Sequence, residues 1–291
     1  MCRLLGYVGE PVLVYDMLYR FKNSLVGQSK HACESEFVVN GDGFGLGWYD
    51  LDLGPEPGVF ASVQPAWNNS NLRYLTQKLK VKSFIAHIRA ATMGVVSQSN
   101  CHPFHFDRWL FAHNGNIENF KQLRRLWQST LDEVYYEYIN GQTDSQNMFA
   151  MWLQKLLSHK PRELLTLHDY ADAMREMLRQ LKWLEHKTQK CFSVHINCVI
   201  TDGTQMFGMR YTNQSFSPAP SLYWSEGQIQ VGADQDEAFV NPNVEKRCVL
   251  IASEKMDRQS HWHEVPENHF VLIDQNLQVQ CESIGAEFLW A

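Results

Sequence analysis

The sequence predicts an α+β fold in which helices and strands occupy separate parts of the chain. Short strand-like segments of apolar residues dominate the first part of the 291-residue chain. From about 117 to 185 the apolar residues recur at helical spacing, and alternating strands return from Cys191 onward. This order of strands, helices and strands is typical of an antiparallel sheet with the helices segregated from it.

The composition fits one globular domain. Hydrophobic residues make up 44% of the chain, and no linker, low-complexity tract or internal repeat divides it. A net charge of −6 without a basic run argues against a nucleic-acid or membrane partner, so we expect a small polar or zwitterionic substrate. Seven dispersed cysteines without a C-x-x-C pair fit reduced thiols and give no zinc framework. No signal-peptide pattern and no apolar run of about 18 residues is present, so we expect a cytoplasmic protein.

The first predicted strand begins with a cysteine. Cys2 follows Met1 and precedes an apolar run that ends at Val8. Because cysteine is small, an aminopeptidase could remove Met1 and leave Cys2 with a thiol and a free α-amine. Their reference pKa values are near ~8.5 and ~7.7–8.0, so the amine could act as the base for the thiol. The simpler interpretation is that Cys2 only begins a buried strand.

The next segments read mainly as strands and loops. Residues 12–21 fit either a helix or a strand, and 22–39 resemble a loop. Residues 40–49 alternate glycines with apolar residues, which predicts a strand closely approached by another backbone or a ligand. A phosphate-binding loop is the alternative, but no helical pattern follows and no Lys-Ser/Thr pair closes it. A turn at 52–57 and a strand at 59–63 follow.

The middle of the chain places polar residues at the ends of regular elements. A strand over 83–91 contains Arg89, and a strand over 109–112 stops at an expected Asn114-Gly115 turn. Thr143 to Gln146 has the form of a capping box at the start of a helix. Helices are predicted over about 117–127, 143–156 and 167–185, and later strands over 192–200, 205–211, 221–224, 228–231, 247–253, 269–274 and 277–281.

Cys2 and the segments around Arg89, Asn114-Gly115 and Asp144 together resemble the glutamine-hydrolysing domain of class II glutamine amidotransferases, which are N-terminal nucleophile hydrolases. The resemblance implies that Cys2 attacks the side-chain amide of a glutamyl group. It also implies that the Asn114 side chain and the Gly115 backbone N–H form the oxyanion hole. Hydrogen-bond donors fixed in advance are the groups that a tetrahedral oxyanion requires.

The same resemblance implies how the substrate is held. Arg89 would bind the α-carboxylate with its planar guanidinium, Asp144 would bind the α-ammonium group, and Thr92 belongs to the same substrate-binding motif. Without the resemblance, Arg89 could be a surface residue and Asp144 only a helix cap. The broader class usually has other residues at Ala90, Met93 and Gln146, so the pocket beyond the scissile amide is expected to differ.

Further motifs resemble the stand-alone amidase branch of this class, which includes a γ-glutamyl amidase of ergothioneine synthesis and a glutathione-degrading subunit. These motifs lie at residues 1–7, 42–49, 102–104 and 252–254. The resemblance implies that residues 1–291 form one glutamine amidotransferase type-2 domain. It further implies a four-layer αββα sandwich of two antiparallel sheets; periodicity alone gives only α+β.

We therefore expect an enzyme that hydrolyses a γ-glutamyl amide through a thioester, releasing glutamate and ammonia or an amine. No metal or organic cofactor is expected. The first alternative is a glutaminase subunit that supplies ammonia to a separate synthetase, or that works with a peptidase subunit. The second is a catalytically silent glutamyl-binding module, which gains support if Met1 is retained. Loops 23–39 and 95–108 are expected to shape the pocket for the leaving group.

Several histidines are weaker candidates for chemistry. His102 with His105, and His261 with His263, could be metal ligands, but no carboxylate or cysteine joins either pair at a fixed spacing. His87 and His113 lie beside the expected site. We interpret them as packed, hydrogen-bonded side chains, because the α-amine of Cys2 already fills the role of base.

Overall fold

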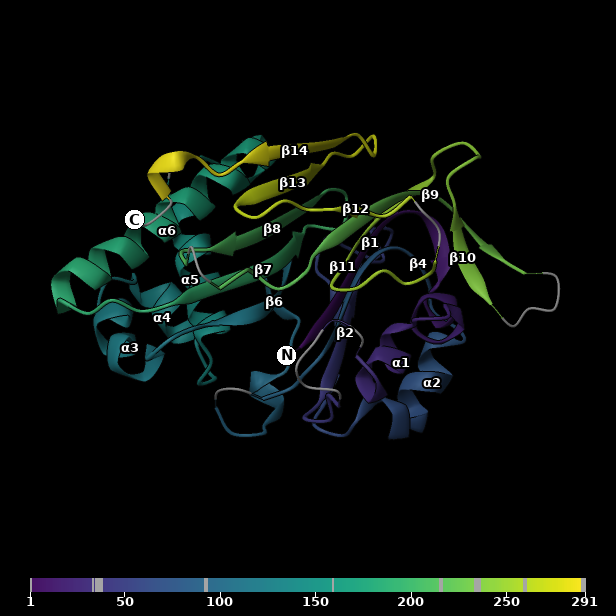
Figure 1. The fold of residues 1–291 in the computed structure, drawn as a ribbon, viewed down its shortest axis with the longest axis horizontal. Coiled ribbons are helices and arrows are strands. Elements are labelled where there is room, and N and C mark those ends of the chain that lie inside the picture. Colours follow the sequence, from purple (N-terminus) through teal and green to yellow (C-terminus); the bar gives the residue numbers. More distant parts are fainter. Residues whose placement is uncertain are drawn as a thin grey trace.

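The computed structural model describes residues 2–32, 34, 39–91, 94–158, 160–214, 217–232, 237–258 and 261–288. Within these residues two antiparallel sheets pack face to face, with α1 and α2 outside one sheet and α3 to α6 outside the other (Figure 1). The α+β class and the αββα architecture are therefore confirmed. No helix in this described part is long and apolar enough to cross a membrane.

The larger sheet is built around β1, which lies between β11 and β4. In the described residues it has eight strands in the order β10-β9-β11-β1-β4-β2-β3, with β12 paired to β9. Its outer face is covered by α1 (Leu25–Lys30) and α2 (Ser70–Thr76). The strands are β1 (Arg3–Leu13), β2 (Phe44–Trp48), β3 (Gly58–Ser62), β4 (Lys80–Ile88), β9 (Tyr223–Val231), β10 (Ala238–Asn241), β11 (Cys248–Ala252) and β12 (His263–Glu264).

The smaller sheet has six strands in the described chain, in the order β14-β13-β8-β7-β6-β5. Its strands are β5 (Phe104–Phe106), β6 (Trp109–Ile117), β7 (Val194–Thr201), β8 (Met206–Thr212), β13 (His269–Ile273) and β14 (Val279–Ser283). Its helices are α3 (Phe120–Gln128), α4 (Glu133–Tyr138), α5 (Asp144–Leu157) and α6 (Leu167–Thr188). Short π and 3-10 segments are η1 (Asp16–Arg20), η2 (Ala66–Asn68), η3 (Gln98–Asn100), η4 (Arg162–Leu164) and η5 (Ala286–Phe288).

Alternation along β1 explains why this strand is central. Leu4 and Val8 face the second sheet and join an inner core with residues of β6, β7 and β11. Leu5 and Tyr7 face the other way and join the outer core beneath α1 and α2. A strand whose two faces are both apolar and buried can only sit between two packed layers.

The glycines of β2 confirm the predicted close approach of another backbone. A Cβ atom added at Gly45 would lie 2.1 Å from the carbonyl oxygen of His102, so only glycine lets the 101–103 segment pack on this strand. The predicted caps are also present. Thr143 accepts a hydrogen bond from the backbone N–H of Gln146, although the Gln146 side chain does not complete a capping box.

The sequence-based interpretation was wrong in four places. The Asn114-Gly115 pair is not a turn but lies inside β6, where Gly115 pairs with Ile196 of β7. The first strand does not end at Val8, because a register shift between Val8 and Val12 lets β1 continue to Leu13. The expected loop at 22–39 contains α1, and the two short strands expected within 221–231 are the single strand β9.

Candidate active site

The Cys2 thiol lies where β1 begins, beside the end of β4. Pairing of Arg3 with Ile88 brings Cys2 next to Arg89 and Ala90. The Cys2 sulfur is 3.3 Å from both the backbone nitrogen and the carbonyl oxygen of Ala90. Burial raises the pKa of this thiol, and the Ala90 hydrogen bond and the guanidinium groups of Arg89 and Arg3 only partly offset that effect. The resting thiol is therefore protonated and needs a base to react.

The Asn114 side chain is tied to the strand that carries Cys2. Asn114 lies in β6 with 2% of its side chain exposed, and its Nδ2 donates to the Ser253 hydroxyl at 2.7 Å. The same hydroxyl accepts the backbone N–H of Leu4 at 3.0 Å. Ser253 thus joins β1 to β6, and an amide N–H₂ group has a second hydrogen that can point elsewhere.

His87 fixes the other end of the same amide. Its Nε2 lies 3.1 Å from Asn114 Oδ1, and its ring packs against His102 with 4.3 Å between ring centres. Burial lowers the pKa of His87 to about 3, so the ring is neutral and can donate its one N–H to Asn114. His113 is also buried, with Nδ1 2.9 Å from the Ser145 hydroxyl. Both rings are packed and hydrogen-bonded, as the sequence analysis expected.

Gly115 follows Asn114 in a conformation that favours glycine. Its φ angle is +140°, and a Cβ atom would lie 1.9 Å from the carbonyl oxygen of His195 in β7. The glycine is therefore required here by close packing of two paired strands. The sequence suggested that Gly115 serves a turn. In the structure the close packing of β6 on β7 requires the glycine instead.

Arg89 follows β4 directly and is 3% exposed. Its backbone N–H donates to the Gly43 carbonyl at 2.8 Å, which fixes the residue to the start of β2. Its guanidinium Nη1 donates to the Val95 carbonyl at 3.3 Å. The Val95 carbonyl therefore fixes one nitrogen of a buried, planar guanidinium group.

Asp144 is the first residue of α5 and is 4% exposed. One carboxylate oxygen accepts the backbone N–H of Ile117 at the end of β6, at 2.8 Å. The other accepts the backbone N–H of Ser145 at 2.8 Å. Each carboxylate oxygen has two lone pairs, so these bonds orient the group and leave it able to accept from a cation. Asp144 and Asn114 are thus attached to the same strand.

A buried ion pair joins Arg3, the residue after Cys2, to Glu254, the residue after Ser253. Arg3 Nε lies 3.1 Å from Glu254 Oε1, and both side chains are 1% exposed. Sequence reasoning gave His87 only a packing role and assigned no role to Ser253 or Glu254. The signal for the first two was the Ala252-Ser253-Glu254 motif, whose function becomes clear only when β11 is seen beside β1.

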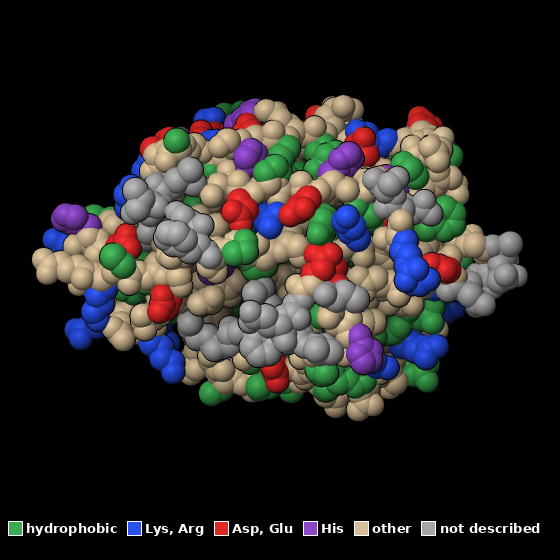
Figure 2. Space-filling model, viewed as in Figure 1, with side chains coloured by type: hydrophobic (Ala, Val, Ile, Leu, Met, Phe, Trp, Pro, Cys, Tyr) green, Lys and Arg blue, Asp and Glu red, His purple; other side chains and the backbone are tan. Residues whose placement is uncertain are grey.

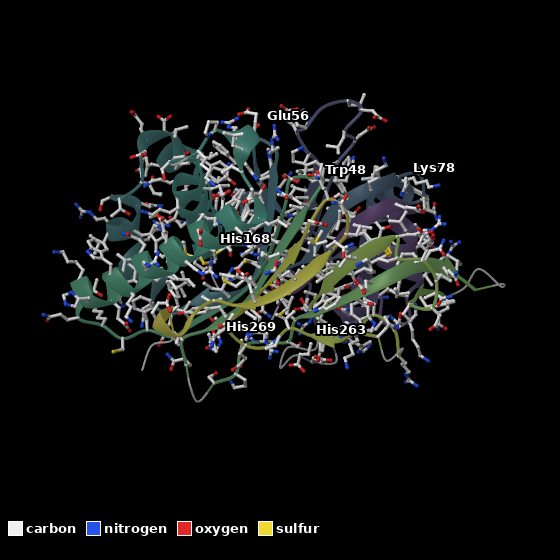
Figure 3. All side chains as sticks on the ribbon, turned by 90° about the horizontal axis from the view of Figure 1, so that it is seen from above. Trp48, Glu56, Lys78, His168, His263 and His269 are labelled. Carbon is white, nitrogen blue, oxygen red and sulfur yellow. The ribbon has the colours of Figure 1, made fainter. Side chains whose placement is uncertain are left out.

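Of the remaining sequence-based candidates, Thr92 lies outside the described residues. Within the part of the chain that the structure describes, no three His, Cys, Asp or Glu side chains are grouped to hold a metal ion. His263 instead stacks on Trp224 with 4.2 Å between ring centres, and Figure 3 shows it on the same side as His269.

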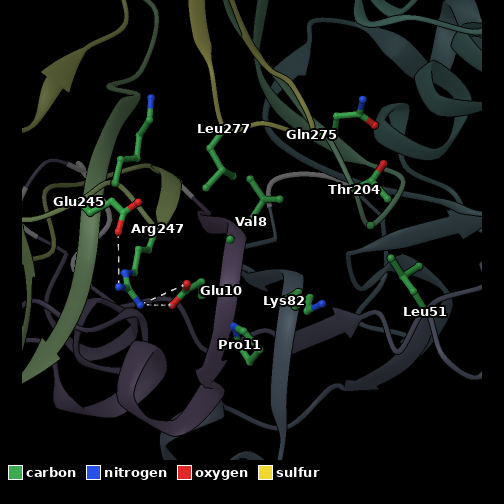
Figure 4. A pocket seen from close by; sticks show the side chains of 13 residues that line it. Val8, Glu10, Pro11, Leu51, Lys82, Thr204, Glu245, Arg247, Gln275 and Leu277 are labelled. Carbon is green, nitrogen blue, oxygen red and sulfur yellow. Dashed lines mark hydrogen bonds and ion pairs between the residues drawn. The ribbon is translucent and has the colours of Figure 1, made fainter.

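A cavity of about 830 Å³ opens at the other end of β1 from Cys2 (Figure 4). Charged side chains in its wall pair with each other, since Arg247 contacts both Glu10 and Glu245. The face drawn in Figure 2 likewise intersperses basic and acidic side chains. The candidate catalytic and substrate-binding residues lie at the Cys2 end of β1, away from this cavity.

Comparison with known proteins identifies the family. The model of "Glutamine amidotransferases class-II" matches residues 1–285. The probable glutamine amidotransferase DUG3 of Saccharomyces cerevisiae is 32% identical over 291 residues, covering 94% of this chain and 82% of that protein. The γ-glutamyl-hercynylcysteine sulfoxide hydrolase of Mycobacterium tuberculosis is 31% identical over 125 residues, 40% of this chain and 50% of that protein. A glutamine aminotransferase class-II domain protein from Silicibacter pomeroyi has the same fold, with a TM-score of 0.64, 23% identity, and coverage of 98% of this chain and 100% of that one.

Proposed function

The chain belongs to the class-II glutamine amidotransferases, and we propose that it hydrolyses a γ-glutamyl amide with Cys2 as its nucleophile. Membership of the family makes the protein an amide hydrolase acting on a small glutamine-type substrate. The name of the mycobacterial relative, a γ-glutamyl hydrolase, supports a γ-glutamyl compound as the substrate here. The leaving group is then ammonia or an amine.

The proposed reaction has two steps. With Met1 removed, the α-amine of Cys2 takes the thiol proton, and the thiolate attacks the γ-carbonyl carbon. The C–N bond breaks, the departing amine receives the proton, and a γ-glutamyl thioester remains on Cys2. Water then attacks the thioester and releases glutamate and the free thiol.

Each remaining residue has one role in this proposal. The second hydrogen of Asn114 Nδ2 and the backbone N–H of Gly115 stabilise the oxyanion in both steps. Arg89 binds the α-carboxylate and Asp144 binds the α-ammonium group, and the family resemblance assigns Thr92, which lies outside the described residues, to substrate binding as well. Arginine suits a carboxylate because its N–H groups form a planar fork, and a carboxylate suits an ammonium ion.

One observation carries the proposal. The Ser253 hydroxyl accepts both the Leu4 N–H, two residues from Cys2, and the Asn114 Nδ2–H. This bridge holds the nucleophile strand and the amide of the expected oxyanion hole in one hydrogen-bonded unit. A binding module without catalysis would have no need to fix an amide donor relative to a thiol.

The test is covalent labelling with 6-diazo-5-oxo-norleucine, a glutamine-like electrophile, followed by intact-mass measurement and peptide mapping. We expect loss of Met1 and one adduct, on Cys2. The exposed thiols of Cys191 and Cys281 serve as internal controls for nonspecific alkylation. Cys2→Ala should abolish the adduct while the circular dichroism spectrum is unchanged.

Turnover then separates the alternatives. Glutamate release from γ-glutamyl amides or peptides by the isolated protein supports the stand-alone hydrolase. An adduct on Cys2 with glutaminase activity only when a synthetase or peptidase subunit is added supports the subunit alternative. Retained Met1 with no adduct would contradict the hydrolase proposal and favour a silent binding module.

A further inference from the structure

Asn100 is a fully buried amide that follows a mostly exposed stretch of its loop. It ends η3, between β4 and β5, with 0% of its side chain exposed, whereas Val95 and Val96 earlier in the same loop are 59% and 52% exposed. Burying an amide is unfavourable unless its donor and acceptor are both satisfied. The partners of Asn100 therefore indicate what the burial achieves.

The hydrogen-bond partners of Asn100 lie next to Arg89 and Asp144, the two residues proposed to bind the glutamyl group. Asn100 Nδ2 donates to the Val95 carbonyl at 2.9 Å, and the same carbonyl accepts Arg89 Nη1 at 3.3 Å. Asn100 Oδ1 accepts the backbone N–H of Gln142 at 2.9 Å. Gln142 stands two residues before Asp144. One side-chain amide thus connects the carbonyl that holds Arg89 to the segment that begins the Asp144 helix.

Hydrogen bonds hold residues 141–147 together, so the position of Gln142 is coupled to the position of Asp144. The backbone N–H of Gly141 donates to the Gln146 side chain at 2.7 Å, and Asn147 Nδ2 donates to the Thr143 carbonyl at 2.8 Å. Because these bonds lock the first turn of α5 to the residues before it, a shift at Gln142 moves Asp144 as well.

We propose that Asn100 is a positioning residue that sets the separation of Arg89 and Asp144 and so controls how tightly the pocket binds the α-carboxylate and α-ammonium groups together. This inference rests on the proposed function of the pocket. Asparagine is required because only an amide offers a donor to Val95 and an acceptor to Gln142 from one planar group. Aspartate keeps the acceptor but turns a second oxygen toward the Val95 carbonyl.

The experiment measures inactivation by 6-diazo-5-oxo-norleucine and by its analogue without the α-amino group, 6-diazo-5-oxohexanoic acid. For Asn100→Ala we expect the inhibition constant of the amino-bearing reagent to rise about tenfold with a nearly unchanged maximal rate, a loss typical of one buried hydrogen-bond network. The analogue has no α-amino group to bind Asp144, so its inhibition constant should rise much less. Asn100→Asp, with the same shape, should behave similarly and keeps the test valid if the alanine variant does not fold.

Asn69→Ala is the matched control. Asn69 is also a buried asparagine that donates one bond and accepts one, but it caps α2, in the helical layer outside the larger sheet. It should lower the melting temperature without changing either inhibition constant. An equal rise in the inhibition constants of both reagents, or the same rise for the amino-bearing reagent with Asn69→Ala, would overturn the inference. Absence of any Cys2 adduct on the unmodified protein would instead overturn the proposed function, and is measured first.

Discussion

Asn114 is held at both ends of its side-chain amide, by Ser253 at Nδ2 and by His87 at Oδ1. Asn114→Ala removes one proposed oxyanion donor and should lower kcat about 10²–10³-fold, as in other enzymes that lose such a donor. KM should change little, because the ground-state carbonyl gains less from this donor than the oxyanion does. Steady-state kinetics on the γ-glutamyl compound found by screening measures both values. A rise in KM at constant kcat would contradict the assignment.

Substitution of Ser253 tests whether its hydrogen bonds with Leu4 and Asn114 contribute to stability and catalysis. Ser253→Ala leaves the Leu4 N–H and one Asn114 N–H without their acceptor in a fully buried place. We expect the free energy of unfolding to fall by about 1–3 kcal/mol and kcat to fall less than for Asn114→Ala. Urea unfolding and kinetics on the same preparation provide the two numbers. Ser158→Ala, at an exposed hydroxyl that follows α5 and donates only to the Lys155 carbonyl among the described residues, is the control and should alter neither.

Candidate site residues could be proposed from sequence where a rare side chain stands at the end of a predicted strand. Cys2, Arg89 and Asn114 were proposed because thiol, guanidinium and amide groups lie at strand ends in the order of a known family, and in the structure Cys2 contacts Ala90, next to Arg89, while Ser253 joins Leu4 to Asn114. Ser253 and His87 could not be assigned roles in this way. Their function depends on β1 lying between β4 and β11, a pairing between residues about eighty and two hundred and fifty positions apart in the chain.

At the level of elements, the start of β1 is secured by the Arg3–Glu254 ion pair, whose partners are both 1% exposed. Glu254→Gln leaves the Arg3 charge buried without its carboxylate, and such losses cost about 3–5 kcal/mol. We therefore expect a large drop in the free energy of unfolding, together with slower labelling of Cys2. Chemical denaturation and the rate of adduct formation measure the two effects.

Glu10→Gln is the control for this prediction, because the exposed Arg247–Glu10 pair lies near the other end of the same strand. Exposed pairs are screened by water, so this variant should leave both stability and labelling nearly unchanged. A similar loss from the two substitutions would mean that β1 is generally sensitive to charge removal. The buried pair would then have no special part in placing Cys2.

Elements were predictable where their period is long enough to read. The cap at Thr143 and the apolar residues at helical spacing locate α5 and α6, and strict alternation locates β7. The short helices α1 and α2 span fewer than two full turns, so their apolar residues show no period. Asn114-Gly115 was misread because an Asn-Gly pair usually marks a turn, whereas here a ligand-site residue and a packing glycine happen to adjoin within a strand.

For the whole molecule, the sequence indicated the fold class but not the layers. Alternation identifies buried positions such as Leu4 and Leu5, yet it cannot say that one faces a second sheet and the other faces helices. That distinction requires knowing which strands pair across long separations. The four-layer arrangement therefore came from resemblance, and the three apolar cores of the structure give it a physical basis.

The whole fold should lose stability in mild acid, because His87, His102 and His113 are buried together in the neutral form. Burial is the main cause that lowers the pKa of all three rings, to about 3 for His87. Below the unfolded value near ~6.5, the unfolded chain binds protons that the folded chain excludes. Between these two values His87 therefore makes the free energy of unfolding fall by about 1.4 kcal/mol per pH unit as the pH drops, and His102 and His113 act in the same direction.

His102 isolates this effect, because neither ring nitrogen has a hydrogen-bond partner among the described residues and its ring packs only against His87 and Phe104 in the aromatic contacts found there. His102→Phe should keep the ring stack while removing one titrating group. Urea unfolding between pH 5.5 and 4.5 should then show a free energy of unfolding that depends less steeply on pH, by at most about 1.4 kcal/mol per pH unit. His168→Phe, at an exposed histidine of α6, should leave the slope unchanged. An equal slope for His102→Phe and the unmodified protein would mean that this ring already titrates in the folded state.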